Sequence, residues 1–410
     1  MSADGGVGLA CPMPDALPAP PHRKHALVLS GGGARGAYQV GVLKALAEHV
    51  PAGTNPFQVV TGLSVGAINA VVLAEGADDF PRAAAKLERL WRGLRCASIY
   101  ETGWGVLGKR TAGWLGAAAF GWAGAKAPPS LLDAGPLARL LAENVDFGRV
   151  DAMAEGDALD ALAITASSYA SGKAVTFFSG SVPTDDWKRA RRTGRRVRMG
   201  AEHVLASAAL PAVFPSVSID GEWFGDGALR QVAPLSPAIH LGCDRLFLIG
   251  ARDLEVGGEA VPTGYPSLGL IAGQLLDIVF NDNMDADIER SARINGTLAA
   301  MAPGNRAKVA LRPVAIQRVN PSLDVRRIAG RHADELPRTV KLLLGAIGAY
   351  GPPWVLPSYL TFEPGFVGAL IDLGYEDGKA RAEEIRAFLS LPGAPSEGDP
   401  AATGTLVTDA

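Results

Sequence analysis

The sequence has few of the features that mark secreted, metal-binding or membrane-spanning proteins. Its 3 cysteines (Cys11, Cys96 and Cys243) lie far apart in 410 residues, which favours neither a disulfide framework nor a zinc site. No uncharged apolar run reaches the roughly eighteen residues of a membrane helix. The first residues lack a charged start followed by an apolar run, so they do not match a Sec signal peptide. We therefore expect a cytoplasmic location, with peripheral contact at a membrane as a further hypothesis.

Acidic and basic residues are present in nearly equal numbers. The chain has 39 Lys and Arg residues against 42 Asp and Glu residues, a net charge of −3, so no overall attraction to nucleic acid is expected. The local exception is residues 188–198, where seven of eleven side chains are Lys or Arg. We interpret this segment as a solvated face or as a contact site for anionic lipid or phosphate. Nucleic acid is the weaker alternative, because Trp187 is the only aromatic residue beside the segment.

The most informative stretch is residues 59–70, VVTGLSVGAINA. An apolar strand pattern leads into Gly62, Ser64 and Gly66, and an apolar helix pattern follows. The motif G-x-S-x-G between a strand and a helix is typical of a nucleophile elbow, in which a sharp turn lifts the serine hydroxyl clear of the sheet. A purely structural turn is the alternative explanation of so short a motif.

A glycine-rich loop precedes this stretch. Residues 26–30 form an apolar strand pattern, GGGARG follows, and a helical pattern continues to residue 50. The glycines fit a dinucleotide-binding motif, but that fold needs an acidic residue at the end of the next strand, which is absent here. The other interpretation is an oxyanion hole, formed by the backbone N–H groups of Gly31, Gly32 and Gly33. Arg35 supports this loop, offers its charge to an anionic substrate group, or is a solvated arginine at the start of the helix.

A candidate carboxylate follows a predicted hairpin. Strand patterns over 217–219 and 222–224 flank Asp220-Gly221, a strong hairpin signal. The returning strand leads into Asp226, which lies between two glycines and would be held on a rigid element. Ordinary turn chemistry is the alternative for this Asp-Gly pair. Further strands are expected over 161–165 and 174–178.

Together these motifs resemble the patatin-like phospholipase family. GGGARG at 31–36, GLSVG at 62–66 and DGA at 226–228 follow the family's order and spacing, and LLDAGPL at 131–137 and ASAALPAVFP at 206–215 also match. The resemblance implies a three-layer α/β/α fold with a central, mainly parallel sheet. It also implies a Ser–Asp dyad, with Ser64 as nucleophile, Asp226 as base and Gly31 to Gly33 as the oxyanion hole, and neither a cofactor nor a metal.

A catalytic histidine is not expected. An α/β-hydrolase would place its histidine after the acid, but that fold usually has several strands before its elbow, and this chain has one. His203 and His240 are therefore expected to cap or pack.

The predicted organisation is a disordered tail over 1–24, a catalytic core over 25–250, a helical extension packed on it over 251–390, and a second tail over 391–410. Four acidic residues of the extension are expected on a solvated helix face, because their spacing matches no calcium loop: Asp282, Asp285, Asp287 and Glu289. The glycine-rich segment 96–130 carries Trp104, Trp114 and Trp122, and we interpret it as a lid or as an ordinary packed excursion.

The favoured function is hydrolysis of lipid carboxylic esters through an acyl-enzyme, so a lipid ester is the expected partner. A thioesterase or a polyhydroxyalkanoate depolymerase with the same dyad is one alternative. A non-catalytic lipid-binding or scaffolding protein is the alternative from another class.

Overall fold

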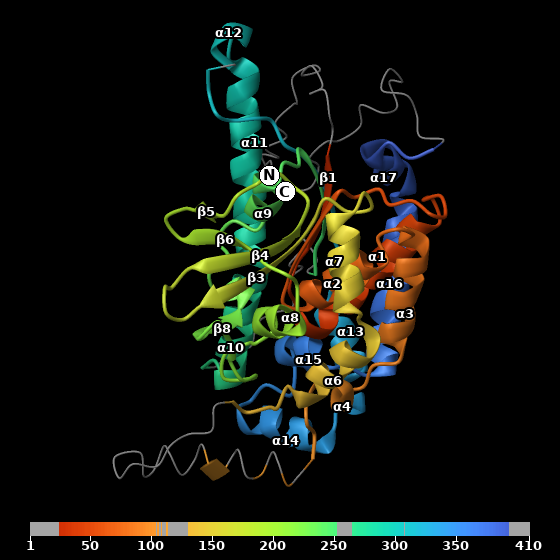
Figure 1. The fold of residues 1–410 in the computed structure, drawn as a ribbon. Coiled ribbons are helices and arrows are strands. Elements are labelled where there is room, and N and C mark those ends of the chain that lie inside the picture. The colour runs from red at the N-terminus through yellow and green to blue at the C-terminus, as the bar shows by residue number, and fades with distance from the viewer. Residues whose placement is uncertain are drawn as a thin grey trace, which may run out of the picture.

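Figure 1 shows the computed structural model of the chain, which describes residues 24–103, 130–251, 265–306 and 308–392 together with positions 105, 108, 112 and 113. Trp104, Trp114 and Trp122 of the predicted lid lie outside the described residues, as do residues 1–23 and 393–410 of the predicted tails.

A mixed sheet forms the centre of the described fold, in the strand order β10-β9-β1-β2-β3-β4-β6-β5. The first five strands in this order are parallel: β10 (Ala315–Val319), β9 (Arg245–Ile249), β1 (His25–Leu29), β2 (Val59–Leu63) and β3 (Ala161–Ser168). The antiparallel β4 (Ala174–Gly180) follows, with β6 (Arg192–Arg196) and the edge strand β5 (Trp187–Lys188). The chain order reverses at β1, and such a reversal is where open α/β sheets usually bind ligands.

The predicted hairpin is present beside this sheet. It consists of β7 (Val217–Ile219) and β8 (Glu222–Asp226), and β8 pairs antiparallel with the end of β3. Both turn residues have a positive φ, 51° at Asp220 and 78° at Gly221, as a tight hairpin turn requires. The strands predicted over 161–165 and 174–178 are likewise confirmed.

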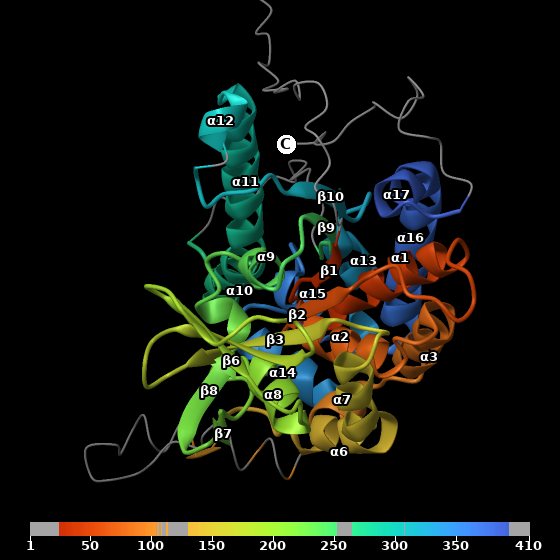
Figure 2. The ribbon, with the colours of Figure 1, turned by 45° about the horizontal axis from the view of Figure 1, so that its top comes forward.

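Helices cover both faces of the sheet, which confirms the three-layer fold (Figures 1 and 2). Alternate residues of β1 point to opposite faces: Leu27 and Leu29 join one core cluster and Ala26 and Val28 the other. On the first face lie α1 (Ala37–Ala47) and α2 (Val65–Glu75), with α3 (Phe80–Arg92), α7 (Phe147–Glu155) and α16 (Pro364–Ala380) around them. On the second lie α9 (Ser236–His240) and α11 (Asn283–Ala300).

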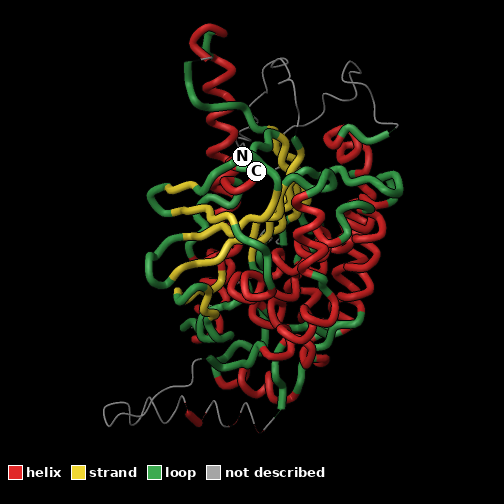
Figure 3. Tube along the Cα trace, in the orientation of Figure 1, coloured by secondary structure: helices red, strands yellow, loops and turns green. Residues whose placement is uncertain are grey.

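The remaining helices lie around this core, and Figure 3 shows helices in red and strands in yellow. They are α4 (Cys96–Ile99), α6 (Gly135–Asn144), α8 (Ala201–Ser207), α10 (Leu268–Asp277), α12 (Pro303–Arg306), α13 (Val325–Arg331), α14 (Arg338–Ala346), α15 (Val355–Leu360) and α17 (Ala382–Leu389). Short turns of helix are η1 (Gly33–Gly36), η3 (Gly227–Leu229), the π-helix η4 (Ile278–Asp282) and η5 (Ala333–Glu335). In the part of the chain that is described, no helix combines the length and apolar character needed to cross a bilayer.

The C-terminal segment shares the core of the preceding residues. Besides its helices it contributes β10, which extends the sheet beside β9. Helix α16 packs on α1 so closely that a Cβ on Gly374 would meet the carbonyl oxygen of Tyr38, and one on Gly41 would meet that of Ile371. Glycine is therefore needed at both positions of this helix contact. The domain boundary near residue 250 stays a prediction.

One surface prediction needs correction, and the structure adds detail to another. Asp287, expected on a solvated helix face, is 6% exposed and accepts a hydrogen bond from the Leu235 N–H at 3.0 Å; burial raises the pKa of its carboxyl. The basic segment 188–198, interpreted as a solvated face or as a contact site for anionic lipid or phosphate, includes β6 and the last residue of β5. Arg195 pairs with Glu222 at 2.8 Å, whereas Lys188 and Arg189 at the sheet edge are exposed.

Candidate active site

Ser64 lies at the sharp turn between β2 and α2. Its backbone has φ 53° and ψ −127°, a left-handed conformation that is strained for a residue with a side chain. Ser64 is the N-cap residue of α2, but its hydroxyl makes no capping hydrogen bond. The hydroxyl therefore stays available at the positive end of a buried helix dipole. The strand, turn and helix predicted from the motif are present.

The two glycines of the motif are explained by close packing around this turn. A Cβ on Gly62 would meet the carbonyl oxygen of Gly66, and a Cβ on Gly66 would meet the carbonyl oxygen of Leu29. The backbone of α2 thus touches both its own strand and the neighbouring one, which no larger residue would permit.

Asp226 ends β8, and the sheet register brings it next to Ser64. Strand β3 pairs Thr165 with Leu63 and Ala166 with Asp226. Asp226 is fully buried, and its Oδ1 accepts a hydrogen bond from the Ala228 N–H at 2.9 Å. Its Oδ2 has no hydrogen-bond partner of normal geometry among the described residues.

The protonation of Asp226 is strongly perturbed. Burial raises the pKa of its carboxyl from 3.8 to about 7, while the Ala228 N–H and the Ser64 hydroxyl lower it by less. A carboxyl with a pKa near neutrality accepts a proton more readily than an ordinary aspartate and is still partly ionised at physiological pH. Such a group next to a serine hydroxyl is suited to general-base chemistry.

Ser207 is a residue of the site that the sequence did not single out. It lies in α8, accepts a hydrogen bond from the Ser64 N–H at 2.9 Å, and donates one to the Thr165 carbonyl at 2.7 Å. It therefore fixes the strained turn to β3. The one available signal was its place in the matching segment 206–215, where small residues allow α8 to approach the sheet.

A chain of buried side-chain hydrogen bonds anchors the start of the glycine loop. Gln39 donates to the Ser30 carbonyl at 2.8 Å, Asn69 donates to Gln39 at 2.9 Å, and the Trp91 indole donates to Asn69 at 2.7 Å. After Ser30 the backbone turns through φ 149° at Gly32 and 56° at Gly33, values that glycine adopts most easily.

An apolar cluster covers this loop and the elbow. It consists of Leu63, Ala228, Phe280, Val355 and Tyr359. A Cβ on Gly31 would meet the Phe280 ring, so this ring lies directly on the loop. Three of the five side chains come from beyond residue 250, where the sequence offered no sign of a contribution to the site.

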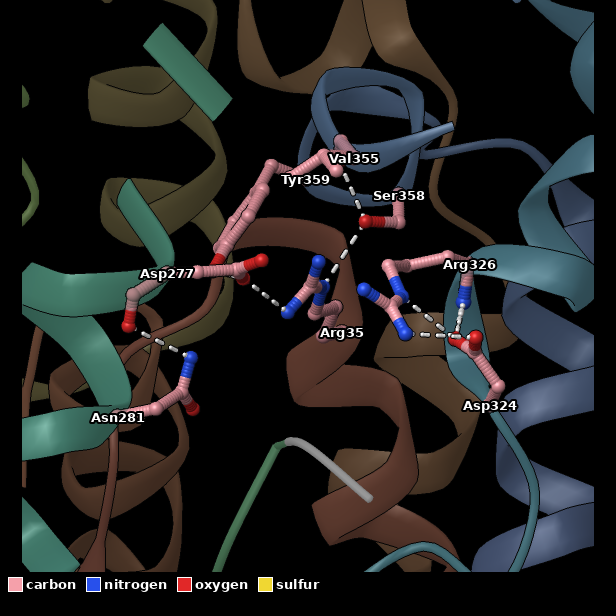
Figure 4. Close-up of polar contacts among 8 residues, drawn as sticks. All are labelled: Arg35, Asp277, Asn281, Asp324, Arg326, Val355, Ser358 and Tyr359. Carbon is pink, nitrogen blue, oxygen red and sulfur yellow. Dashed lines mark hydrogen bonds and ion pairs between the residues drawn. The ribbon is translucent and has the colours of Figure 1, made fainter. Parts of the chain in front are cut away.

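Arg35 is buried beside the loop, with 1% of its surface exposed. Its Nη1 forms an ion pair with Asp277 at 3.0 Å, and its Nε donates to Ser358 Oγ at 2.9 Å (Figure 4). This burial excludes a solvated arginine, and of the two remaining predicted roles it favours support of the loop over contact with a substrate.

The histidines have structural contacts, as predicted. His203 Nδ1 accepts the Gly200 N–H at 3.0 Å at the start of α8, and the His240 ring lies 5.1 Å from that of Trp187. Across the described ranges, no group of His, Cys, Asp and Glu side chains is arranged to hold a metal ion.

Comparison with known sequence families identifies the chain over more than half of its length. A sequence model described as patatin-like phospholipase matches residues 27–239, a little over half of the chain. Among curated proteins, lysophospholipase nte1 of Aspergillus terreus is 43% identical over 76 residues, which cover 17% of this chain and 5% of that protein. The chain thus aligns with about a twentieth of the length of this relative.

Two solved structures are similar to this chain at low sequence identity. VipD from Legionella pneumophila has a TM-score of 0.35 and 15% identity, with 90% of this chain and 67% of that chain covered. Human GIVD cytosolic phospholipase A2 in complex with methyl gamma-linolenyl fluorophosphonate has a TM-score of 0.41 and 12% identity, with 90% and 59% covered.

The raised pKa of Asp226 predicts a pH-dependent effect of Asp226→Asn on stability. Because the folded-state pKa of about 7 exceeds the ordinary value of 3.8, stability from this carboxyl is full below pH 4 and is lost as the pH rises through 7. The neutral amide avoids this loss. The variant should gain about 2–3 kcal/mol of unfolding free energy over wild type between pH 5 and pH 8.

Urea unfolding of the full chain at pH 5, 6.5 and 8 measures this gain. Asp220→Asn, a change in the exposed turn of the β7–β8 hairpin, is the matched control and should show no such trend. A constant difference between Asp226→Asn and wild type over this range would contradict the assignment.

Proposed function

Because the chain belongs to the patatin-like phospholipase family, we propose that it hydrolyses carboxylic esters of lipids with Ser64 as nucleophile and Asp226 as general base. In the first step the Ser64 hydroxyl attacks the ester carbonyl while Asp226 accepts its proton. The carbonyl oxygen becomes negative and is stabilised by backbone N–H groups of Gly31, Gly32 and Gly33. The proton passes to the leaving alcohol, and an acyl-enzyme on Ser64 remains.

In the second step Asp226 takes a proton from water, and the resulting hydroxide attacks the acyl-enzyme. The proton returns to Ser64, and a fatty acid leaves. One water is consumed for each ester bond, and no cofactor takes part. Removal of one oxyanion donor typically costs about 3 kcal/mol of transition-state stabilisation, so the loop is expected to contribute substantially to the rate.

The observation that carries this proposal is the pairing of a strained serine with a buried carboxyl. An exposed aspartate, with a pKa near 4, is a weak base toward a serine hydroxyl. Burial raises the pKa of Asp226 to about 7, which supplies basicity without a histidine. Ser64 has φ 53°, and such strain is often found at catalytic residues.

The apolar cluster over the site supports a lipid acyl chain as the group that is bound. Its members are aliphatic or aromatic, and the partly buried Leu210, Leu276 and Val279 pack against them. Burial also disfavours the ionised form of Asp226, which is what maintains its raised pKa.

Substitution of the nucleophile tests the proposal directly. Ser64→Ala should lower turnover of p-nitrophenyl butyrate and of phosphatidylcholine at least about 1000-fold, because no acyl-enzyme can form. Wild type should be labelled by a fluorophosphonate at Ser64, as identified by peptide mass spectrometry. Ser181→Ala, on the exposed loop after β4, is the control and should behave as wild type. An unlabelled and inactive wild type would instead indicate a non-catalytic lipid-binding protein.

We further propose that helix α10 contacts the lipid surface from which the substrate comes. Leu268, Ile271 and Leu275 of α10 and Ile278 at the start of η4 follow one another at helical spacing and are 72%, 41%, 56% and 50% exposed. Between Tyr265 and Leu276 no residue is charged. The inner side of the same helix reaches the active-site cluster through Leu276, so a lipid surface on the outer side would lie next to the site.

A second copy of the chain fits this surface less well. Four partly exposed aliphatic side chains present on the order of 300 Å² of apolar area, short of the about 800 Å² per partner of a stable protein interface. An uncharged aliphatic face suits the boundary between lipid head groups and acyl chains, where apolar side chains insert without a shape-matched partner.

Leu275→Lys should weaken binding of the full chain to phosphatidylcholine–phosphatidylglycerol vesicles about tenfold, because a charge replaces an inserted side chain. The control is Leu311→Lys, which introduces the same charge at a leucine of equal exposure, 55% against 56%. Leu311 precedes the N-terminal end of β10, whereas Ser64 follows the C-terminal end of β2, and β10 to β2 are parallel, so the two residues lie at opposite ends of these strands. Equal vesicle cosedimentation of the two variants would refute this contact. It would also be refuted if Leu275→Lys changed the oligomeric state of the chain and left vesicle binding unchanged.

A further inference from the structure

We infer that the segment beyond residue 250 is part of the catalytic unit, and that Asp277 and Tyr359 act as positioning residues that hold the oxyanion loop in place through Arg35. The inference rests on the function proposed above. The loop and Arg35 lie within the residues 27–239 that match the family model, whereas Asp277, Ser358 and Tyr359 lie outside them.

The first link is a buried ion pair between Arg35 and Asp277. Their side chains are 1% and 9% exposed, and Arg35 Nη1 lies 3.0 Å from Asp277 Oδ1. At this burial neither charge is compensated by water, so each depends on the other. In the described part of the chain Arg35 Nη2 has no hydrogen-bond partner, and the orientation of the guanidinium is therefore set by Asp277 and by Ser358, as Figure 4 shows.

The second link is Tyr359, which contacts both members of the pair. Its hydroxyl donates to Asp277 Oδ1 at 2.7 Å, and its ring lies over the guanidinium, 3.9 Å from Arg35 Cζ. Burial has the largest effect on this phenol and raises its pKa, as does the nearby Asp277. Arg35 lowers the pKa, but by less than burial raises it. Tyr359 therefore remains a neutral donor, and it fixes the carboxylate that fixes Arg35.

The third link joins the backbones. A Cβ on Gly33 would meet the carbonyl oxygen of Tyr359, so α15 rests directly on the glycine loop. Arg35 N–H in turn donates to the Gly32 carbonyl at 3.2 Å. The conformation of Gly32 and Gly33 thus depends on contacts with α10 and α15, at a distance of more than 240 residues along the chain.

A positioning role predicts that a small change in this network slows the chemical step. Displacement of catalytic donors by about 1 Å can lower the rate up to 100-fold. Tyr359→Phe removes one hydroxyl and keeps the ring on Arg35, so the fold should persist. It should lower kcat about tenfold and leave KM within about twofold, because the oxyanion exists only in the transition state.

Hydrogen exchange of the loop gives a readout that does not depend on activity. In Tyr359→Phe, peptides that contain Gly31 to Gly33 should exchange faster than in wild type. Tyr350→Phe is the matched control: it removes a hydroxyl of the same segment that contacts Asp334 at 3.2 Å, away from Arg35. It should change neither kcat nor exchange in the loop.

The result that overturns the inference is unchanged loop exchange in Tyr359→Phe, or a kcat equal to that of the control. Asp277→Asn provides an independent check, since it keeps the shape but removes the charge opposite Arg35 and should have the larger effect on both measurements. If wild type proved inactive and Ser64 unlabelled, the proposed function would fail, while faster loop exchange would still support the link to the C-terminal segment.

Discussion

The site depends on one constraint, which is that the carboxyl group of Asp226 is buried with few hydrogen-bond donors to stabilise its charge. Asp226 is fully buried, accepts a single backbone hydrogen bond through Oδ1, and leaves Oδ2 without a partner in the described structure. Burial of this kind destabilises the folded state when the carboxyl is ionised. The rest of the fold must therefore supply enough packing energy to hold Asp226 beside Ser64. The sheet does so because β3 pairs with β2 on one side and with β8 at its end.

The strained backbone at the Ser64 turn is likewise stabilised by contacts with the surrounding fold. The positive φ of Ser64 is stabilised by the hydrogen bond from its N–H to Ser207, which is itself bonded to β3. Beneath the loop, Gln39, Asn69 and Trp91 form a chain of buried side-chain hydrogen bonds. Above it lie Phe280 and Tyr359 of the C-terminal segment. Core and C-terminal segment therefore enclose the loop from both sides. The same segment also extends the sheet through β10 and packs closely on α1.

The local parts of this arrangement could be predicted from the sequence. Glycines at fixed spacing between apolar runs indicated the turn at Ser64 and the loop before α1, and Asp220-Gly221 indicated the hairpin that leads to Asp226. Such signals are short-range, because each depends on the backbone conformation of a few neighbouring residues. The fold class followed from the resemblance to the patatin-like phospholipase family, which three such signals carry together.

Contacts between distant segments could not be predicted in this way. Asp277 and Arg35 are 242 positions apart, and an acidic residue at the end of an apolar helix carries no sign of its partner. Asp287 was assigned to a solvated face for the same reason, since a backbone N–H as its partner leaves no pattern in composition. Ser207 is a small residue in a segment of small residues, and only the register of β3 reveals its bond to the elbow.

The most direct test of this account is the pH dependence of Ser64 labelling by a fluorophosphonate, because it reports the base and the nucleophile together. The labelling rate of wild type should rise about tenfold per pH unit at low pH and level off above about pH 7, and in Asp226→Asn it should be slow at every pH. A wild-type rate that is constant from pH 5 to pH 9, or labelling at another residue, would contradict the pairing of Ser64 with Asp226.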